Sequence, residues 1–373
     1  MSFLDPWFYL CLLLALPVYW LTPSRFRMSL LLAATGGWLA YASETTLGVF
    51  VALGVFAWLG GVWISKGPNE TSRNTRKWIA SGSVIAFAVL ARIFFKDMFG
   101  GLTLSVQSEI DEALKLFGFA YVVLKVHHYF VIAKATKSMP LSFFQTLHFL
   151  LYIPTISAGP ILRVREFKPL EKETQYSPEH FEVGIKRIAL GLVKKVFVVL
   201  LLLQVTQTLW PRPEWWIQPV LLLLSVFTIY FDFSGYTDIA IGIARLFGHK
   251  VPENFKNPFS ATSLSQFWRK WHITMGDWIR EHIFIPMGGM RASKAKIALI
   301  LFTSMIFCGI WHAFEWRFVA WGLYHGTLIT LEQAMGIHPL PPNAPRYKKL
   351  IRQLVILAIM SGSVIFFIPQ YWT

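Results

Sequence analysis

Two histidines, His272 and His312, occur in segments rich in tryptophan and charge, and this residue type suits proton transfer at a hydroxyl. Histidine titrates near neutral pH, so in a site that excludes water it can act as a general base. The sequence has no H-E-x-x-H, G-x-S-x-G or C-x-x-C pattern, and we therefore predict no metal site, serine nucleophile elbow or dithiol centre. If the protein is an enzyme, histidine must carry its chemistry.

The first of these segments, LSQFWRKWHITMGDWIREHIFIP, covers residues 264–286. Ser263 and Gln266 have the spacing of a capping box, which predicts a helix that begins at residue 264. On that helix Trp268 and His272 would stack at i, i+4. An amphipathic helix lying in the membrane interface is one interpretation. We favour a protein cleft partly open to water, because the charges and aromatic rings go all round the helix rather than along one face.

The second segment, CGIWHAFEWRFVAWGLYHG, covers residues 308–326 and places His312 at the end of an apolar span. A charged turn with Glu315 and Arg317 leads on to His325. A lone histidine on an apolar helix is more often structural than catalytic, so residue type and position alone leave both interpretations open.

Two carboxylates, Asp232 and Asp238, interrupt an otherwise lipid-compatible helix over residues 230–248. Each would cost about 2.5–3.5 kcal/mol at the bilayer centre, so both should face protein, water or a counter-ion. Asp238 and Arg245 are two turns apart and share a face, which makes an internal ion pair one interpretation. Asp232 is the better candidate for the wall of a polar cavity.

A further break occurs in YIPTISAGPILRVREF, residues 152–167, where proline and glycine interrupt an apolar context. Such a break is tolerated at membrane depth where the backbone is buried in protein or lines a cavity. A loop at the membrane surface with snorkelling arginines is the equal alternative.

The composition of the chain indicates that the helices carrying these residues lie in a membrane. Of the 373 residues, 55% are hydrophobic and 15% are charged, with a mean hydropathy of +0.50, well above the soluble norm in apolar content. The chain is thus an integral membrane protein with roughly ten or eleven apolar stretches near spanning length. The start of the chain lacks the pattern of a cleaved signal peptide, so we expect the first helix to remain as an anchor. Cys11 and Cys308 lie in apolar runs and are interpreted as packing residues.

The net charge of +15 is interpreted as loop charge facing the cytoplasm, not as a nucleic-acid surface. Basic residues follow the first, third and fifth predicted spans, as Arg25 and Arg27, as Arg73 and Arg76, and as Lys134 and Lys137. Because these are alternate loops, we expect a multi-pass protein with its N-terminus outside.

We treat residues 1–373 as a single membrane-embedded domain. Within it, we predict that residues 1–140 form scaffold helices and that residues 150–330 form the motif-bearing catalytic core. Residues 338–373 form a proline-rich linker and a C-terminal helix.

From about residue 150 to 330, four motifs resemble in order and spacing the membrane-bound O-acyltransferase family, and specifically its bacterial branch. The motifs are TISAGPILRVREF, then FDFSGYTDIAIGIARLFG followed by PENFKNPF, then SLSQFWRKWHITMGDWIREHIFIPMGG, then GIWHAFEWRFVAWGLYHG. That branch includes proteins of D-alanyl transfer to lipoteichoic acid and of alginate O-acetylation.

The resemblance implies an all-α polytopic membrane fold, with transmembrane and short re-entrant or interfacial helices around a central funnel or tunnel. His312 matches the family's invariant catalytic histidine, and His272 matches the tunnel histidine of the W-R-x-W-H motif. Both are candidate catalytic residues. The expected tunnel-lining residues are Trp268, Arg269, Trp271, Asp232, Asn254, Asn257, Trp311 and His325, the two asparagines being assigned to the amides of the donor arm.

The resemblance also implies the activity. Family members take an acyl group from a cytoplasmic thioester donor, either coenzyme A or a phosphopantetheine carrier protein, with no bound cofactor. The bacterial branch passes it outward, often through an envelope partner protein, to hydroxyls of a polymer. We therefore expect a membrane O-acyltransferase of the bacterial inner (cytoplasmic) membrane that transfers a D-alanyl or acetyl group.

Two departures and two rival functions accompany this expectation. Ala313 stands where the branch commonly has glycine, and the short chain is closer in size to the D-alanyl transfer type. A transporter or flippase would use the same charges without covalent chemistry, but its usual paired repeats are absent from the sequence. A non-catalytic envelope scaffold is the other alternative.

Overall fold

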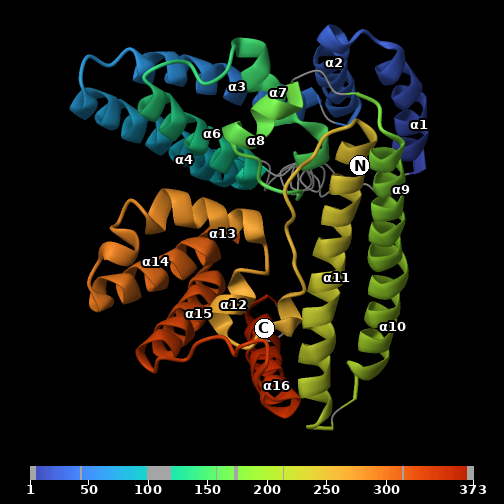
Figure 1. The fold of residues 1–373 in the computed structure, drawn as a ribbon, viewed down its shortest axis with the longest axis vertical. Helices are drawn as coiled ribbons and strands as arrows, with labels where there is room; N and C mark the ends of the chain where they lie inside the picture. The colour runs from blue at the N-terminus through green and yellow to red at the C-terminus, as the bar shows by residue number, and fades with distance from the viewer. Residues whose placement is uncertain are drawn as a thin grey trace. The chain divides into compact units, whose positions relative to one another are not determined.

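A computed structural model describes residues 6–42, 44–98, 119–156, 158–171, 175–212, 214–312 and 315–367. Within these ranges every regular element is a helix (Figure 1). Five helical stretches are long and apolar enough to cross a bilayer, namely Leu47–Ser65, Pro178–Leu209, Ile217–Leu246, Lys294–His312 and Arg346–Phe366. The prediction of an all-α membrane protein is thereby confirmed, while ten or eleven crossings remain a prediction.

The chain separates into two compact units. The first contains Met1–Ala189 and Thr237–Pro252, and the second contains Leu190–Tyr236 and Glu253–Thr373. The predicted division into scaffold helices, motif-bearing core and C-terminal segment stays a prediction. Ala313 lies outside the described residues, as do residues 368–373 of the predicted C-terminal segment.

The first unit is built from α1 to α9 and packs a core of aliphatic and aromatic side chains. Its helices are α1 (Pro6–Leu21), α2 (Ser24–Ala42), α3 (Glu44–Ser65), α4 (Glu70–Met98), α6 (Phe119–Thr136), α7 (Phe143–Leu151), α8 (Val164–Phe167) and α9 (Pro178–Leu192). Short 3₁₀ turns cover Ile153–Thr155 and Lys168–Glu171. Helix α3 packs against α4, α6 and α7 in this unit (Figure 1).

The interrupted segment after α7 lies inside this unit rather than at a surface. Pro154 and Gly159 are buried, and Arg163, only 9% exposed, is paired with Glu166. A Cβ on Gly159 would come within 2.7 Å of the Pro154 carbonyl oxygen, so only glycine permits this fold of the backbone. Burial by protein therefore accounts for the break at Pro154 and Gly159, whereas Arg165 near the end of the segment is exposed.

The carboxylate of Asp238 is paired with Arg187 of α9, not with Arg245, which corrects the ion pair considered from sequence. The partner lies fifty-one residues away in the chain, on a helix that approaches closely through glycine. A Cβ on Gly242 would lie 2.7 Å from the carbonyl oxygen of Gly184. Spacing along one helix could not reveal a partner on a neighbouring helix.

The second unit carries the π-helical turn Val193–Val198, α10 (Val199–Leu209) and the first part of α11 (Ile217–Leu246). After these come the 3₁₀ turn Pro258–Ser260, α12 (Leu264–Trp268), α13 (Ile273–Ile279), the π-helical turn Arg280–Phe284 and the 3₁₀ turn Gly289–Arg291. The unit ends with α14 (Lys294–His312), α15 (Trp316–Ala334), α16 (Arg346–Ser363) and the 3₁₀ turn Val364–Phe366.

Helices α14 and α15 form a close antiparallel hairpin in this unit (Figure 1). A Cβ on Gly309 would lie 2.1 Å from the Phe318 carbonyl oxygen, and one on Gly322 would lie 2.7 Å from the Met305 carbonyl oxygen. Small residues let helix backbones approach in this way in membrane proteins. The hairpin thus fixes His312, the last residue of α14, against the first turns of α15.

Candidate active site

The segment that begins at residue 264 is not one continuous helix. Helix α12 begins at Leu264 as predicted, and the Ser263 hydroxyl accepts a hydrogen bond from the Gln266 amide at 3.1 Å. It ends at Trp268, and His272 adopts a left-handed conformation (φ 44°, ψ 56°) before α13 begins at Ile273. The predicted i, i+4 stacking of Trp268 and His272 on one helix is therefore wrong, because the chain turns between them.

Glu332 of α15 anchors the start of α12. Its carboxylate accepts hydrogen bonds from the backbone amides of Leu264 and Ser265 and from the Ser265 hydroxyl. The side chain is buried, so these bonds supply the partners that a buried charge requires. A carboxylate at a helix N-terminus also interacts favourably with the helix dipole. Glu332 therefore ties α15 to the helix that carries Trp268.

Asn254 holds His272 in its unusual backbone conformation. The Asn254 carbonyl oxygen accepts from the Ile273 amide at 2.9 Å, and Oδ1 accepts from the Thr274 amide and hydroxyl at 3.2 and 2.9 Å. The same Oδ1 lies 3.0 Å from Nδ1 of His272. Asn254 is fully buried and its oxygens bind the protein, while its predicted contact with the amides of a donor arm stays a prediction.

These contacts define the tautomer of His272. The Thr274 amide can only donate, so the Asn254 atom facing it is oxygen, and Nδ1 of His272 must carry the hydrogen that this oxygen accepts. Burial lowers the pKa of His272 to about 3, with a smaller contribution from His312. The ring is therefore neutral near pH 7, and Nε2 is the nitrogen with a lone pair.

Aromatic side chains surround His312. Its ring is stacked on Phe318 at a centroid distance of 6.1 Å and meets Trp321 edge-on at 5.6 Å. Trp311 stands between the two histidines, 5.1 Å from the ring of His312 and 6.1 Å from that of His272. Phe367 lies 5.5 Å from the ring of His312 on a third side. Because Phe318 and Trp321 both come from α15, the glycine-mediated approach of α14 and α15 helps to set the position of His312.

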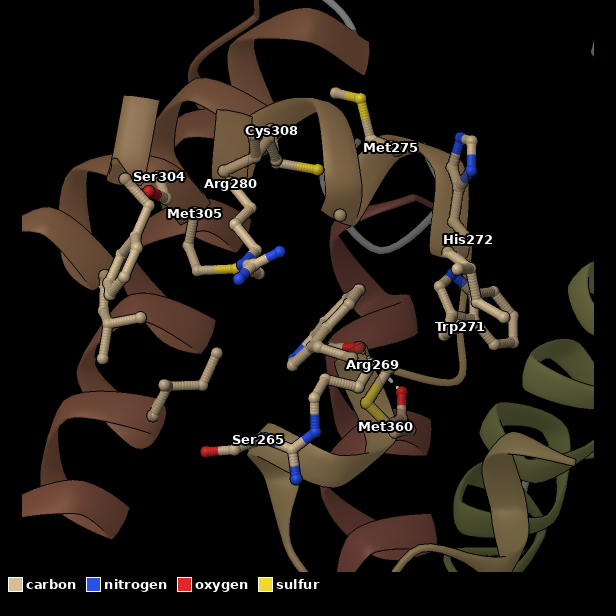
Figure 2. A pocket seen from close by; sticks show the side chains of 18 of the residues that line it. Ser265, Arg269, Trp271, His272, Met275, Arg280, Ser304, Met305, Cys308 and Met360 are labelled. Carbon is tan, nitrogen blue, oxygen red and sulfur yellow. Dashed lines mark hydrogen bonds between the residues drawn. The ribbon is translucent and has the colours of Figure 1, made fainter. Parts of the chain in front are cut away.

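One cavity of about 820 Å³ brings the two histidines together within the second unit. Its walls include five predicted site residues, which are His272, His312, Trp268, Arg269 and Trp271. Figure 2 shows Trp271 and His272 at one end of the open space, Ser304 toward the other, and the Arg280 side chain extending between them. The remaining lining is mostly apolar, from α11, α14, α15 and α16.

The other five predicted residues do not line this cavity, so their expected role in a tunnel stays a prediction. Asp232 is paired with Lys195, and Asn257 is exposed and adopts a left-handed conformation before a 3₁₀ turn. Asn254 contacts His272, and the Trp311 ring contacts both histidines. His325 is fully buried between Trp268 and Trp321, at centroid distances of 5.0 and 4.7 Å.

Several residues of the site were not predicted from sequence. Cys308, interpreted as a packing residue, lines the cavity one helical turn before His312. Their i, i+4 spacing on α14 was the available signal. Glu332 and Trp321 were also missed as parts of the site, and for Glu332 no local pattern connects it to a helix sixty-eight residues earlier.

The sequence of this chain is similar to that of a known protein family and of several named relatives. Residues 69–368 match the model of the membrane-bound O-acyltransferase family. The chain is 30% identical to a probable alginate O-acetylase of Azotobacter vinelandii over 96% of this chain and 73% of that protein. It is 35% identical to a peptidoglycan O-acetyltransferase of Helicobacter pylori over 52% of this chain and 39% of that protein. It is 30% identical to a teichoic acid D-alanyltransferase of Bacillus subtilis over 49% of this chain and 50% of that protein.

Proposed function

Because the chain belongs to the membrane-bound O-acyltransferase family, we propose that it transfers an acyl group from a thioester donor to a hydroxyl of a cell-envelope polymer, with His312 as the general base. The protein is a membrane acyltransferase, as its family and its named relatives indicate. The observation that supports the proposed mechanism is the position of His272 and His312 on the wall of one cavity.

Acetyl is the acyl group that the comparisons favour. The probable alginate O-acetylase is aligned with nearly the whole of this chain, whereas the D-alanyltransferase is aligned with about half of it. The size of the chain had favoured the D-alanyl type, and the extent of these alignments outweighs that argument. A polysaccharide hydroxyl is accordingly the acceptor we propose.

The reaction transfers the acyl group from the sulfur of the thioester donor to the oxygen of the acceptor hydroxyl. His312 takes the proton from the acceptor hydroxyl as its oxygen attacks the thioester carbonyl, so that an O–C bond forms and the C–S bond breaks. The proton then passes from the imidazolium to the departing thiolate, which leaves as a thiol. General base catalysis contributes about 10²–10⁴-fold, so holding both reactants in one cavity must supply much of the remainder.

His272 and the tryptophans shape the space in which this happens. His272 is fixed in its Nδ1–H tautomer by Asn254, so its Nε2 can accept a hydrogen bond from the substrate. Trp268 and Trp271 supply flat apolar walls from α12 and the turn that follows it. The mostly apolar lining limits contact with water around the histidines, which strengthens each polar interaction made there.

The proposal includes the donor, the partners and the location of the protein. Coenzyme A or a phosphopantetheine carrier protein would present the thioester on the cytoplasmic side, and an envelope protein with its polymer would receive the acyl group outside. The protein would span the bacterial cytoplasmic membrane several times with its N-terminus outside, supported by the alternation of basic loops.

The experiment is to measure acyl transfer by the His312→Ala variant of the full-length protein. We expect a loss of about 10²–10⁴-fold with normal membrane insertion. His338→Ala is the matched control, since His338 lines the same cavity but lies beyond α15 in the chain. Unchanged transfer by His312→Ala would end the proposal.

A further inference from the structure

Two arginines line the cavity together with the histidines. Arg269 follows the last residue of α12 and Arg280 follows the last residue of α13. Figure 2 shows Arg280 extending into the open space and Arg269 lying beside Ser265 at the wall of the same space. The two guanidinium groups therefore face one cavity from two different helices.

Neither arginine is neutralised by the protein. Among the described residues, no ion pair or hydrogen bond is made by either guanidinium group, whereas the other cationic side chains of this unit at Lys195 and Arg317 have carboxylate partners. Asp277 is the one acidic residue on the lining that the structure describes. The cavity is otherwise apolar with neutral polar groups, so it carries an excess of positive charge.

An apolar cavity with two unpaired guanidinium groups is suited to an anion. Both side chains are exposed, so their guanidinium groups are accessible to a ligand that enters the cavity. Guanidinium groups form two parallel hydrogen bonds with phosphate, and are preferred over lysine where an anion of that shape is recognised.

We propose that Arg269 and Arg280 form a phosphate-binding subsite that holds the phosphate of the thioester donor. The inference rests on the proposed function, since it names the part of the donor that the cavity recognises. Both donor classes carry a phosphate at the end of a flexible arm whose other end is the thiol. Binding the phosphate at the arginines leaves the thioester within the same cavity as His312.

This assignment makes the donor, not the acceptor, the ligand of the arginines. It also accounts for the charge in the opening part of the motif, where Arg269 stands beside two tryptophans. The tryptophans would contact the methyl and methylene groups of the arm while the guanidinium group binds its phosphate. A phospholipid headgroup carries the same chemical group, so the experiment must separate these two sources.

The test is equilibrium binding of two soluble ligands to the full-length protein in detergent. Pantetheine and 4′-phosphopantetheine differ only in the phosphate, so the ratio of their Kd values measures its contribution. Charge-assisted hydrogen bonds predict that the phosphate tightens binding by about tenfold or more. Raising the salt concentration should reduce that ratio.

The variants Arg269→Gln and Arg280→Gln should each lower the Kd ratio while leaving the Kd of pantetheine nearly unchanged. Lys270→Gln is the matched control, because Lys270 donates to the Ser260 hydroxyl and does not line the cavity. The His312→Ala variant should keep the full ratio, which separates this inference from the proposed catalytic role.

Three results would overturn the inference. Equal affinity for the two ligands, or no measurable binding of either, would show that the cavity does not recognise the phosphate. A ratio unaffected by both arginine variants would place the phosphate elsewhere. Competition of phosphatidylglycerol in mixed micelles that is stronger than that of 4′-phosphopantetheine would assign the arginines to lipid.

Discussion

Replacing Asn254 by aspartate keeps the shape of the side chain that holds His272 and adds a negative charge beside its ring. In the native protein Oδ1 lies 3.0 Å from Nδ1, and burial lowers the pKa of His272 to about 3. The Thr274 amide and hydroxyl would still donate to the new carboxylate and favour its ionised form. The variant therefore changes the electrostatics of His272 more than its geometry.

The magnitude follows from the distance. Two charges about 4 Å apart at an effective dielectric constant of about 20 interact by about 4 kcal/mol, equivalent to raising the pKa of His272 from about 3 to about 6. A histidine with a depressed folded pKa contributes full stability above its unfolded pKa of about 6.5, and that stability is lost as pH falls. Between pH 8 and 5 the native His272 should therefore cost the protein about 2 kcal/mol of stability, and His272 of the variant less than about 1 kcal/mol.

The assay is the free energy of unfolding in detergent at pH 8 and pH 5. Asn257→Asp is the control, because Asn257 is exposed and the substitution adds the same charge without a contact to His272. The Asn254→Asp variant should lose about 1 kcal/mol less than this control on acidification. Equal losses in the two variants would refute the deduced hydrogen bond between Asn254 and His272.

Two further substitutions test how the site is positioned. Glu332→Gln should destabilise the protein by about 1–3 kcal/mol, because the α12 amides lose a charged acceptor. The control Glu315→Gln, at an exposed ion pair, should cost less than about 1 kcal/mol. Equal effects of the two substitutions on thermal unfolding would contradict this prediction. Gly309→Ala should reduce both folding yield and acyl transfer, because its Cβ would lie 2.1 Å from the Phe318 carbonyl oxygen. The control Gly36→Ala in α2 adds a Cβ in open space and should match the native protein. Normal yield and transfer by Gly309→Ala would show that the close hairpin does not position His312.

The sequence predicted the parts of the site that depend on residue type and local spacing. The start of α12 at Leu264 and the approach of His272 and His312 to one cavity could be predicted, the first from its capping residue and the second from the resemblance of four motifs. The turn after Trp268 could not be predicted from the sequence. It depends on Asn254, whose hydrogen bonds replace those that a continuous helix would have made.

Tertiary pairing explains why some predicted residues do not line the cavity. Asp232 looked like a cavity wall because a carboxylate in an apolar helix needs a partner, and that partner is Lys195 thirty-seven residues earlier. Asn254 looked like a ligand of the substrate because asparagine can hydrogen-bond amides, and it uses its oxygen on the protein instead. Periodicity along one helix gives the face on which such a residue lies, but not the side chain opposite.

The most direct test of the central claim is transfer from a thioester labelled in its acyl group by the purified full-length protein reconstituted in vesicles. The account predicts that the label becomes covalently attached to a hydroxyl acceptor, that a thiol is released in equal amount, and that His312→Ala abolishes both. Label that crosses the vesicle membrane while still joined to its donor, with no ester formed, would contradict the account and indicate transport.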